Sequence, residues 1–239
     1  MITVHHLHKQ FAGMTAVSDL SFEAADGRIT GLLGANGAGK TTTMRMICGV
    51  LKPQRGSVWI DGSSSNPQPR VGALLDHMGL YPRLTARENL MYFGELRGLP
   101  PARLRERVEE LLGTLGLEPI ADHRAAGFSQ GERMKTALGR ALIHSPGNLL
   151  LDEPTNGLDV HTVRSLRDVL KKMRDAGTCV LLSSHVLQEV CALCDRVVIV
   201  SKGSVVAQGS PDELCLQSAS ASLEDAFVKL TQAEVNGKC

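Results

Sequence analysis

Hydrophobic residues in the first part of the 239-residue chain alternate with polar ones, whereas those in its middle follow a helical spacing. Residues 2–8, 17–24 and 57–61 have the alternation that is typical of strands with one buried face. Asp26-Gly27 marks a turn after the second of these runs. The pattern therefore predicts a small antiparallel β subdomain at the N-terminus.

Short continuous apolar runs predict a second group of strands, which are buried on both faces. Segments with helical spacing separate these runs. Because strands alternate with helices, we expect an α/β fold with a mostly parallel sheet that helices cover. The predicted buried strands lie at residues 28–33, 71–75, 148–151 and 178–183, with a hairpin at 197–208. The predicted helices lie at residues 41–48, 85–96, 103–112, 129–143, 160–175 and 186–194, and from Pro211 onward.

Two of the predicted helices begin with the spacing of a capping box. Thr85 is followed three residues later by Glu88, and Ser129 is followed three residues later by Glu132. In this arrangement each side chain bonds a backbone N–H that the first helical turn leaves free. We therefore expect one helix to start at Thr85 and another at Ser129.

The helical segments in the middle of the chain form one block between two strand-rich halves. We interpret this block, at about residues 77–144, as an inserted α-helical subdomain rather than a separate domain. The core is then formed by residues 1–76 and 145–215, with a C-terminal helical tail at about 216–239. The whole chain is expected to be a single domain, which its length allows.

A glycine-rich stretch at residues 34–41 fits the phosphate-binding pattern G-x-x-x-x-G-K-[ST] at every fixed position. It lies between a predicted strand and a predicted helix, so the helix N-terminus points at the phosphates. Lys40 would reach the β- and γ-phosphates, and the Thr41 hydroxyl would ligate Mg²⁺. The residues predicted to hold the nucleotide are Gly34, Ala35, Asn36, Gly37, Ala38, Gly39, Lys40, Thr41 and Thr42.

Acidic residues and a histidine follow two of the predicted buried strands. Asp152 ends one strand, where a rigidly held carboxylate can bind Mg²⁺ or its water shell, and Glu153 beside it could polarise an attacking water. His185 ends the next strand and could hydrogen-bond the γ-phosphate. Ligands of open α/β folds bind at this carboxyl edge of the sheet. The three residues therefore predict phosphoryl transfer to water, with Glu153 and His185 as the catalytic pair.

Ser129 predicts a second anion site. A serine N-cap with Gly131 in the first helical turn exposes N–H groups and a positive dipole end to an anion. The loop at residues 34–41 already has a helix of its own. Two anion sites for one nucleotide indicate that Ser129 and Gly131 serve a nucleotide held by another copy of the chain.

Composition weighs against a nucleic-acid partner. The net charge is +1 and aromatic residues make up 3% of the chain, so neither a basic field nor base-stacking platforms are expected. The N-terminal residues lack the apolar region of a secretory signal, and no apolar run has the length needed to cross a bilayer. We therefore expect a cytoplasmic protein.

Taken in order, these motifs resemble the ATP-binding subunit of ABC transporters, and the resemblance covers essentially the whole chain. The loop corresponds to Walker A, and His185 corresponds to the switch histidine. Phe11 corresponds to the aromatic A-loop residue, although the residues alone leave open whether its ring stacks on adenine or packs in the core. The remaining correspondences are residues 149–153 with Walker B, 128–132 with the signature sequence and 156–159 with the D-loop.

The resemblance implies a P-loop NTPase (RecA-like) core that binds ATP with Mg²⁺. It implies two cassettes, expected to be identical, that close head to tail with each ATP between one Walker A and the partner's Ser129 and Gly131. It also implies an integral membrane permease, which would hold the chain at the inner face of the cell membrane.

Residues 79–90 and 152–159 resemble the ABC-2 exporter branch, with sodium-extruding ATP-binding subunits the most similar. The chain departs from the family at two places. The signature has Gln130 and Glu132 where glycine and glutamine are commonest, and Asp76 aligns with the glutamine that usually contacts Mg²⁺. We expect Asp76 to be a metal ligand. The alternative function is a soluble ABC ATPase acting on ribosomes or DNA, whose members usually carry two cassettes or long coiled coils.

Overall fold

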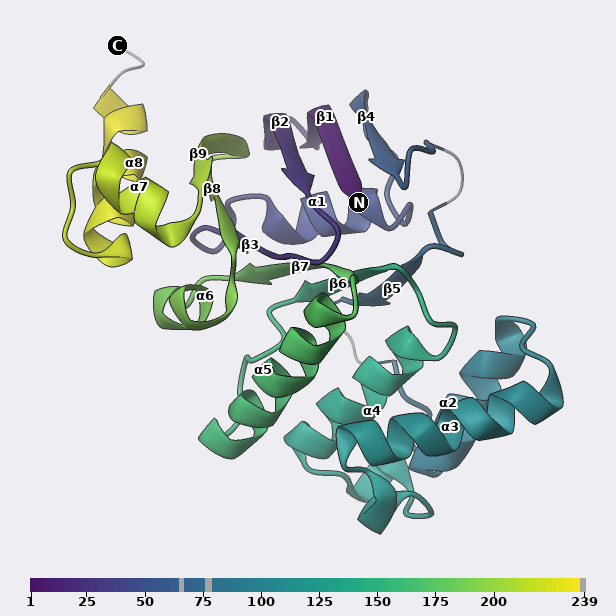
Figure 1. Cartoon of the computed structure of the whole chain (residues 1–239). Coiled ribbons are helices and arrows are strands. Elements are labelled where there is room, and N and C mark those ends of the chain that lie inside the picture. Colours follow the sequence, from purple (N-terminus) through teal and green to yellow (C-terminus); the bar gives the residue numbers. More distant parts are fainter. Residues whose placement is uncertain (65–66, 76–78, 237–239) are drawn as a thin grey trace.

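The computed structural model describes residues 1–64, 67–75 and 79–236, and for 233–236 it describes the backbone alone. Within these residues, nine strands form one sheet in the order β4-β1-β2-β9-β8-β3-β7-β6-β5. Helix α1 lies under the curled part of this sheet, and α5 and α6 lie on its opposite side (Figure 1). The expected α/β architecture is confirmed.

The antiparallel part of the sheet consists of β1 (Ile2–Phe11), β2 (Met14–Ala24) and β4 (Arg55–Ile60). Strand β1 lies between the other two and pairs antiparallel with both. These strands do not form a separate sheet, because β2 joins β9 through a single parallel bridge between Asp19 and Ser204. The alternating pattern thus identified the strands, and this bridge makes them continuous with the parallel part.

The parallel part of the sheet is built from strands that are buried on both faces. Strand β3 lies between β7 and β8 and pairs parallel with both, and β6 lies between β7 and β5 in the same way. Strand β9 returns antiparallel to β8, which confirms the predicted hairpin. The bounds are β3 (Ile29–Leu33), β5 (Val71–Leu74), β6 (Asn148–Asp152), β7 (Cys179–Ser184), β8 (Arg196–Ser201) and β9 (Ser204–Gly209).

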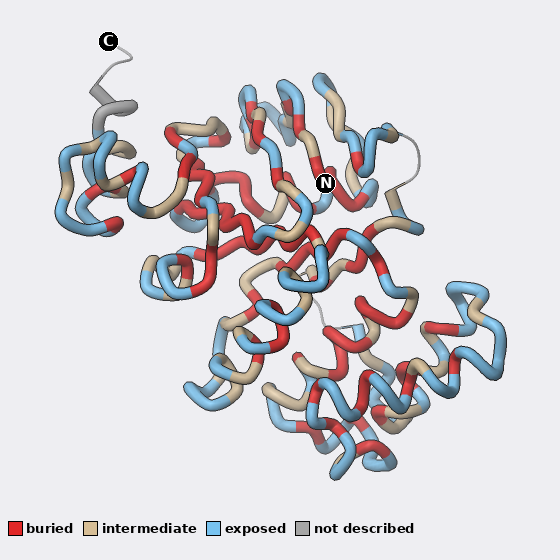
Figure 2. Tube along the Cα trace, viewed as in Figure 1, coloured by how far each residue is buried: buried red, intermediate tan, exposed pale blue. Residues whose placement is uncertain are grey.

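Helices on both faces of the sheet bury its apolar side chains in two clusters. The central strands are accordingly buried along most of their length (Figure 2). Helix α1 (Lys40–Ile47) contributes Met44 to one cluster, which also contains Leu32 and Leu181. Helix α5 (Val160–Asp175) packs Leu170 in the other, which also receives α6 (Leu187–Leu193). Because successive strand residues point to opposite faces, β3 and β7 contribute to both clusters. This packing holds the carboxyl ends of the central strands rigidly beside the start of α1.

Three helices, α2 (Ala86–Leu96), α3 (Pro101–Leu115) and α4 (Gln130–Leu142), pack on one another beyond β5 and β6 (Figure 1). Both predicted capping boxes are confirmed, at Thr85 and at Ser129. Short 3-10 turns at Glu118–Ile120 and Ala125–Gly127 connect α3 to α4. The first residue of α4 therefore sits at a defined place, which matters for the second predicted anion site.

The C-terminal segment differs from the single helical run predicted from Pro211 onward. It forms two helices, α7 (Pro211–Gln217) and α8 (Leu223–Asn236), separated by a serine-rich break. Serine side chains compete with the helical backbone for hydrogen bonds. Here the Ser218 hydroxyl donates to the carbonyl of Leu214, and the Ser222 hydroxyl accepts from the N–H of Asp225, which starts α8 afresh.

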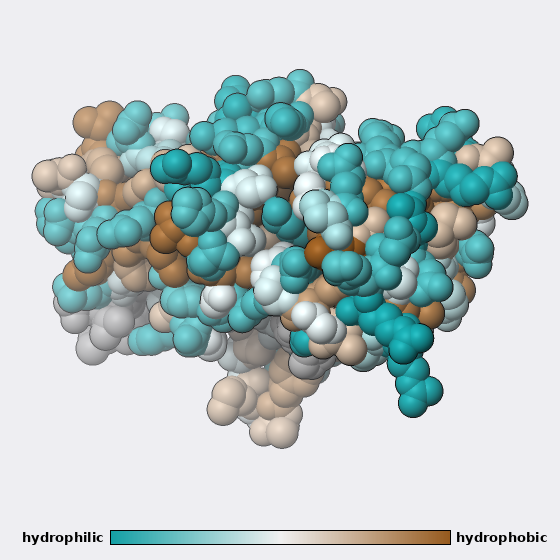
Figure 3. Space-filling model, turned by 90° about the horizontal axis from the view of Figure 1, so that it is seen from below, coloured by the Kyte–Doolittle hydropathy of each residue, from teal (hydrophilic) through white to brown (hydrophobic). Residues whose placement is uncertain are grey.

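Every helix in the described residues is too short or too polar to cross a lipid bilayer. The surface seen from below is mostly hydrophilic, with apolar side chains in small separate patches (Figure 3).

Candidate active site

The glycine-rich loop connects β3 to α1 and is held tightly by its neighbours. Gly37 and Gly39 have φ angles of 81° and 101°, a left-handed conformation that other residues rarely adopt. A Cβ atom on Gly39 would lie 2.4 Å from the carbonyl oxygen of Ala16, and one on Gly34 would lie 2.4 Å from that of Val200. The loop can take this shape only because glycines occupy these positions.

Lys40 is the first residue of α1, and its side chain is 5% exposed. Its ammonium group donates to the carbonyl oxygen of Gly34 at 2.7 Å and to that of Ala35 at 3.3 Å. It also lies 3.2 Å from Oε1 of Glu153. The lysine thus folds back over its own loop, and its charge is shared with the predicted catalytic carboxylate.

The other predicted nucleotide contacts lie on the same loop and helix turn. Ala35, Asn36 and Gly37 form the exposed tip, whereas Ala38 is buried below them and Thr42 is half-buried in the first turn of α1. Their contact with a nucleotide stays a prediction.

Thr41 and Asp152, two of the three predicted metal ligands, converge. The Thr41 hydroxyl donates to Oδ2 of Asp152 at 2.7 Å. The other carboxylate oxygen of Asp152 accepts from the hydroxyl of Ser183, because the parallel pairing of β6 with β7 places these two residues side by side. Hydroxyl and carboxylate oxygens are the ligands that Mg²⁺ prefers, so this pair fits a magnesium ion.

Ser183 is a residue of the site to which the sequence assigned no role. It donates to Asp152, and its hydroxyl also accepts the backbone N–H of Glu153 at 3.0 Å. A hydroxyl residue ending the strand next to Asp152 is the signal that could have identified it.

Glu153 lies between two other charged or polar residues of the site, Lys40 and His185. Its φ is 48°, a left-handed conformation that is uncommon for a residue with a side chain and that clusters at functional sites. One carboxylate oxygen faces Lys40, and the other lies 2.8 Å from Nδ1 of His185, which follows β7. The structure therefore brings together Lys40, Thr41, Asp152, Glu153 and His185, as the sequence predicted.

A hollow of about 340 Å³ opens beside these residues. Thr41, Asp152 and Glu153 form one part of its lining, and Gln130 and Asn156 form another. Leu75 also lines it; the residue that follows, Asp76, lies outside the described residues, so its role as a metal ligand stays a prediction.

Ser129 and Gly131 lie at the start of α4 and line a different hollow from the phosphate-loop residues. Ser129 is exposed at the start of α4, where its hydroxyl accepts the N–H of Glu132 at 3.3 Å and donates to the carboxylate of Glu132 at 2.8 Å. With Gly131 and Thr162 it lines a second hollow of about 160 Å³. Among the described residues that line it, none belongs to the phosphate loop or to Walker B.

Phe11 is 46% exposed at the end of β1, and the ammonium of Lys9 lies 5.4 Å from the centre of its ring. The alternative that Phe11 packs in the core is therefore wrong. Its stacking on adenine stays a prediction.

Comparison with known proteins agrees with this geometry. A family model described as "ABC transporter" matches residues 17–156. The chain is 39% identical over 238 residues to the ABC transporter ATP-binding protein NatA of Bacillus subtilis. The alignment covers 95% of this chain and 97% of NatA. Two solved structures are similar along most of their length. An ATP-binding subunit of an ABC transporter has a TM-score of 0.88 at 30% identity, covering 97% of this chain and 99% of that one. A dimeric bacterial ABC transporter cassette has a TM-score of 0.81 at 25% identity, and the match covers 88% of this chain and 98% of the cassette.

The matched family model spans more than half of the chain, and NatA is matched along nearly its whole length. The fold is that of a P-loop NTPase, with its phosphate loop at the carboxyl end of a central parallel strand. The chain therefore belongs to the ABC transporter family, as an ATP-binding subunit that binds ATP with Mg²⁺ and hydrolyses it.

Proposed function

We propose that this subunit powers export by closing head to tail with a second copy of itself over two ATP molecules. The observation that carries the proposal is the separation of two half-sites on one chain. Lys40, Thr41 and Glu153 meet at the phosphate loop, whereas Ser129 and Gly131 line another hollow. Anion-binding groups that lie apart on one subunit can be completed by a neighbour that supplies the missing half.

In this arrangement each residue has a defined task. Lys40 leaves Glu153 and neutralises charge on the β- and γ-phosphates, since phosphate competes with the carboxylate for the same ammonium. Glu153, freed from Lys40, accepts a proton from the attacking water, and His185 orients its carboxylate from the other side. Thr41 and Asp152 would hold Mg²⁺, which would supply positive charge to neutralise the phosphates. The helix dipole of α4 at Ser129 closes the site from the partner subunit.

Export, and sodium as the exported ion, are the finer parts of the proposal. They are supported by the resemblance of residues 79–90, 128–132, 152–159 and 183–186 to sodium-extruding subunits of the ABC-2 branch. The related proteins described above give no support to the alternative of a ribosome- or DNA-directed ATPase. The subunit would then lie on the cytoplasmic face of the membrane, held there by its permease. Sodium efflux from vesicles that contain the subunit with its permease tests this part directly.

A tyrosine patch on the helical subdomain, predicted at about residues 77–144, is our candidate for the permease contact. The chain has 2 tyrosines, and both lie here. Tyr81 and Tyr92 stack edge to face at 5.0 Å, and Phe93 completes the group. With Pro82, the tyrosines line an open hollow of about 420 Å³. Exposed apolar patches of this kind mark sites where partners bind.

The split site is tested by two substitutions in the purified chain. Lys40→Ala should abolish ATP binding, because the phosphates lose their nearest cation. Ser129→Arg should leave ATP binding by the monomer intact and block ATP-dependent dimerisation, because the bulky cation fills the partner's half-site. Calorimetric titration gives the affinity, and analytical ultracentrifugation with non-hydrolysed ATP gives the dimer. Equal loss of ATP binding in the two variants would contradict the proposal.

A further inference from the structure

The side chain of Gln130 bridges two parts of the molecule that serve different nucleotides in the proposed dimer. Gln130 is the first residue of α4, between Ser129 and Gly131. Its amide nitrogen donates to the backbone carbonyl of Asn156 at 2.9 Å. Asn156 belongs to the loop that follows Glu153. The start of α4 is thus tied by a side chain to the loop of the catalytic carboxylate.

The loop at residues 154–159 is shaped around this glutamine. Gly157 has a φ of 72°, and a Cβ atom there would lie 2.4 Å from the amide nitrogen of Gln130. No side chain can be added without displacing the glutamine or the loop. The loop and the side chain therefore fit each other closely, which is what a positional link requires.

A second hydrogen bond continues the link to the site of hydrolysis. The N–H of Asn156 donates to the carbonyl oxygen of Glu153 at 3.1 Å. The peptide units of Asn156 thus connect Gln130 on one side with Glu153 on the other. Gln130 also lines the same hollow as Asp152 and Glu153. A shift of α4 would be felt at Glu153 through two hydrogen bonds.

The far end of the loop, at Asp159, is anchored to α5. This anchor lies beside Gly131 in the first turn of α4. Asp159 caps α5, and its carboxylate accepts the hydroxyl of Thr162 at 2.6 Å. A Cβ atom on Gly131 would lie 2.9 Å from that hydroxyl. The loop is therefore held near the start of α4 in its middle, where Gln130 bonds Asn156, and at its far end, where Asp159 bonds Thr162 beside Gly131.

We propose that Gln130 is a positioning residue that couples the two ATP sites of the dimer. When the γ-phosphate held by the partner draws the start of α4 toward it, the link through Asn156 brings Glu153 of the same chain into its working position. Each site is then fully active only when the other holds ATP, so hydrolysis becomes cooperative. A glycine at this position would lack the side chain that bonds the carbonyl of Asn156. The inference rests on the proposed head-to-tail dimer.

The test compares Gln130→Glu with the unaltered subunit in complex with its permease. A glutamate has nearly the same shape, but its carboxylate cannot donate to the carbonyl of Asn156. An acidic residue in the first helical turn is favourable for the helix, so the variant is expected to fold. Gln130→Gly removes the side chain altogether, and Gln217→Glu, an exposed residue of α7, is the matched control.

The rate of ATP hydrolysis is measured against ATP concentration, and ATP affinity is measured separately on the isolated chain. We expect a Hill coefficient above 1.5 for the unaltered complex and for Gln217→Glu. In Gln130→Glu the coefficient should fall to about 1 and kcat at least tenfold, with ATP affinity of the isolated chain within twofold. Gln130→Gly should behave in the same way.

Cooperative hydrolysis with unchanged kcat in Gln130→Glu would overturn the coupling role. A parallel loss of ATP affinity in the isolated chain would also overturn it, by placing Gln130 in nucleotide binding instead. If the unaltered subunit forms no ATP-dependent dimer, the proposed function itself fails. That failure appears in ultracentrifugation of the unaltered chain and is therefore distinguishable from a failure of Gln130 alone.

Discussion

Replacing Glu153 by glutamine should strengthen ATP binding while it slows hydrolysis. The carboxylate contacts both Lys40 and His185, so it has two effects that the substitution separates. Glutamine keeps the shape of the side chain but accepts no proton from water. Loss of a general base lowers kcat by about 10²–10⁴-fold. At the same time Lys40 is released from its carboxylate partner and becomes free to meet the phosphates.

The gain in affinity can be worked from the geometry. At 3.2 Å, opposite unit charges attract by about 1–5 kcal/mol for effective dielectric constants of about 80 to 20. The Glu153 side chain is 22% exposed and shares its charge with His185, so we take the lower end, about 1 kcal/mol. That free energy corresponds to an affinity for ATP about five- to tenfold higher in Glu153→Gln. Lys40 keeps its two carbonyl acceptors in the variant, so the loop should retain its shape.

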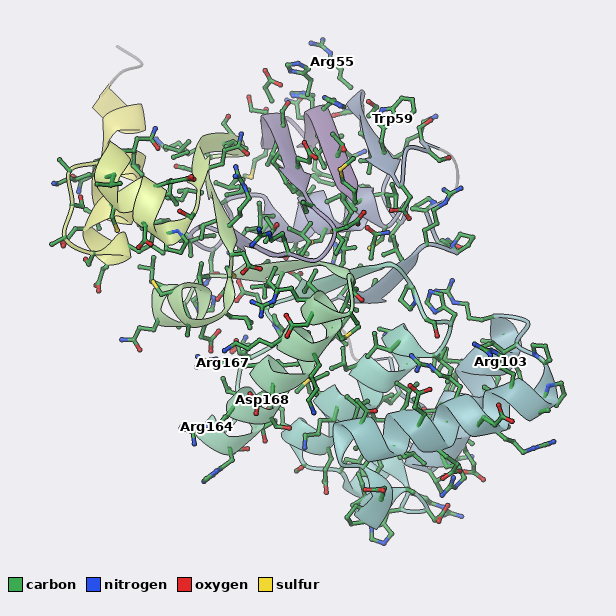
Figure 4. The ribbon with its side chains drawn as sticks, in the orientation of Figure 1. Arg55, Trp59, Arg103, Arg164, Arg167 and Asp168 are labelled. Carbon is green, nitrogen blue, oxygen red and sulfur yellow. The ribbon has the colours of Figure 1, made fainter. Side chains whose placement is uncertain are left out.

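The assay combines calorimetric titration of ATP without Mg²⁺ and steady-state hydrolysis with Mg²⁺. Asp168→Asn is the matched control, because this carboxylate is exposed on α5, outside the phosphate-loop cluster (Figure 4). It makes the same change of charge and should alter neither quantity. An unchanged Kd for ATP in Glu153→Gln would refute the competition between carboxylate and phosphate. An unchanged kcat would refute the role of Glu153 toward water.

Three further predictions concern stability and partner binding. His144 has a pKa lowered to about 4 by burial and by the charges of neighbouring arginines, whereas its ordinary value is 6.5. Only the unfolded chain takes up this proton as the pH falls from 6.5 to 4, so the free energy of unfolding should drop over that window. Because His144 is only partly buried, we expect a drop of about 1–2 kcal/mol. Urea titrations should show this pH dependence in the native chain and lose it in His144→Gln. Leu104 is fully buried in α3, so Leu104→Ala should lower the free energy of unfolding by about 2–5 kcal/mol. The exposed Leu216→Ala should change it by less than about 0.5 kcal/mol in the same denaturation experiment. Tyr81→Ser with Tyr92→Ser should abolish co-purification of the permease from membranes while ATP affinity stays unchanged; retained co-purification would place the contact elsewhere.

Much of the fold could be predicted from the sequence, because its signals are local. The helix expected at residues 160–175 is observed with these bounds, since its apolar stripe spans its whole length. The capping boxes at Thr85 and Ser129 specified helix starts through bonds between residues three apart. The prediction was wrong beyond Pro211, where serines at 218–222 divide one expected helix into two. Apolar spacing alone did not reveal that break.

In the site, too, local patterns predicted some residues, whereas other contacts depend on how distant segments pack. The glycine pattern and the strand ends identified Lys40, Asp152, Glu153 and His185, because parallel strands bring their carboxyl ends to one edge of the sheet. The bond from Ser183 to Asp152 needed the register between β6 and β7, which no local pattern specifies.

By itself, the sequence determined the elements, the phosphate loop and the identity of the charged groups around it. Only the tertiary structure decided that Lys40 pairs with Glu153, and that Gln130 reaches Asn156 across 26 positions of the chain. It also placed Ser129 in a hollow apart from Lys40. The physical reason is that periodicity and capping depend on neighbours a few residues away, whereas these contacts depend on how α4, α5 and the sheet pack together.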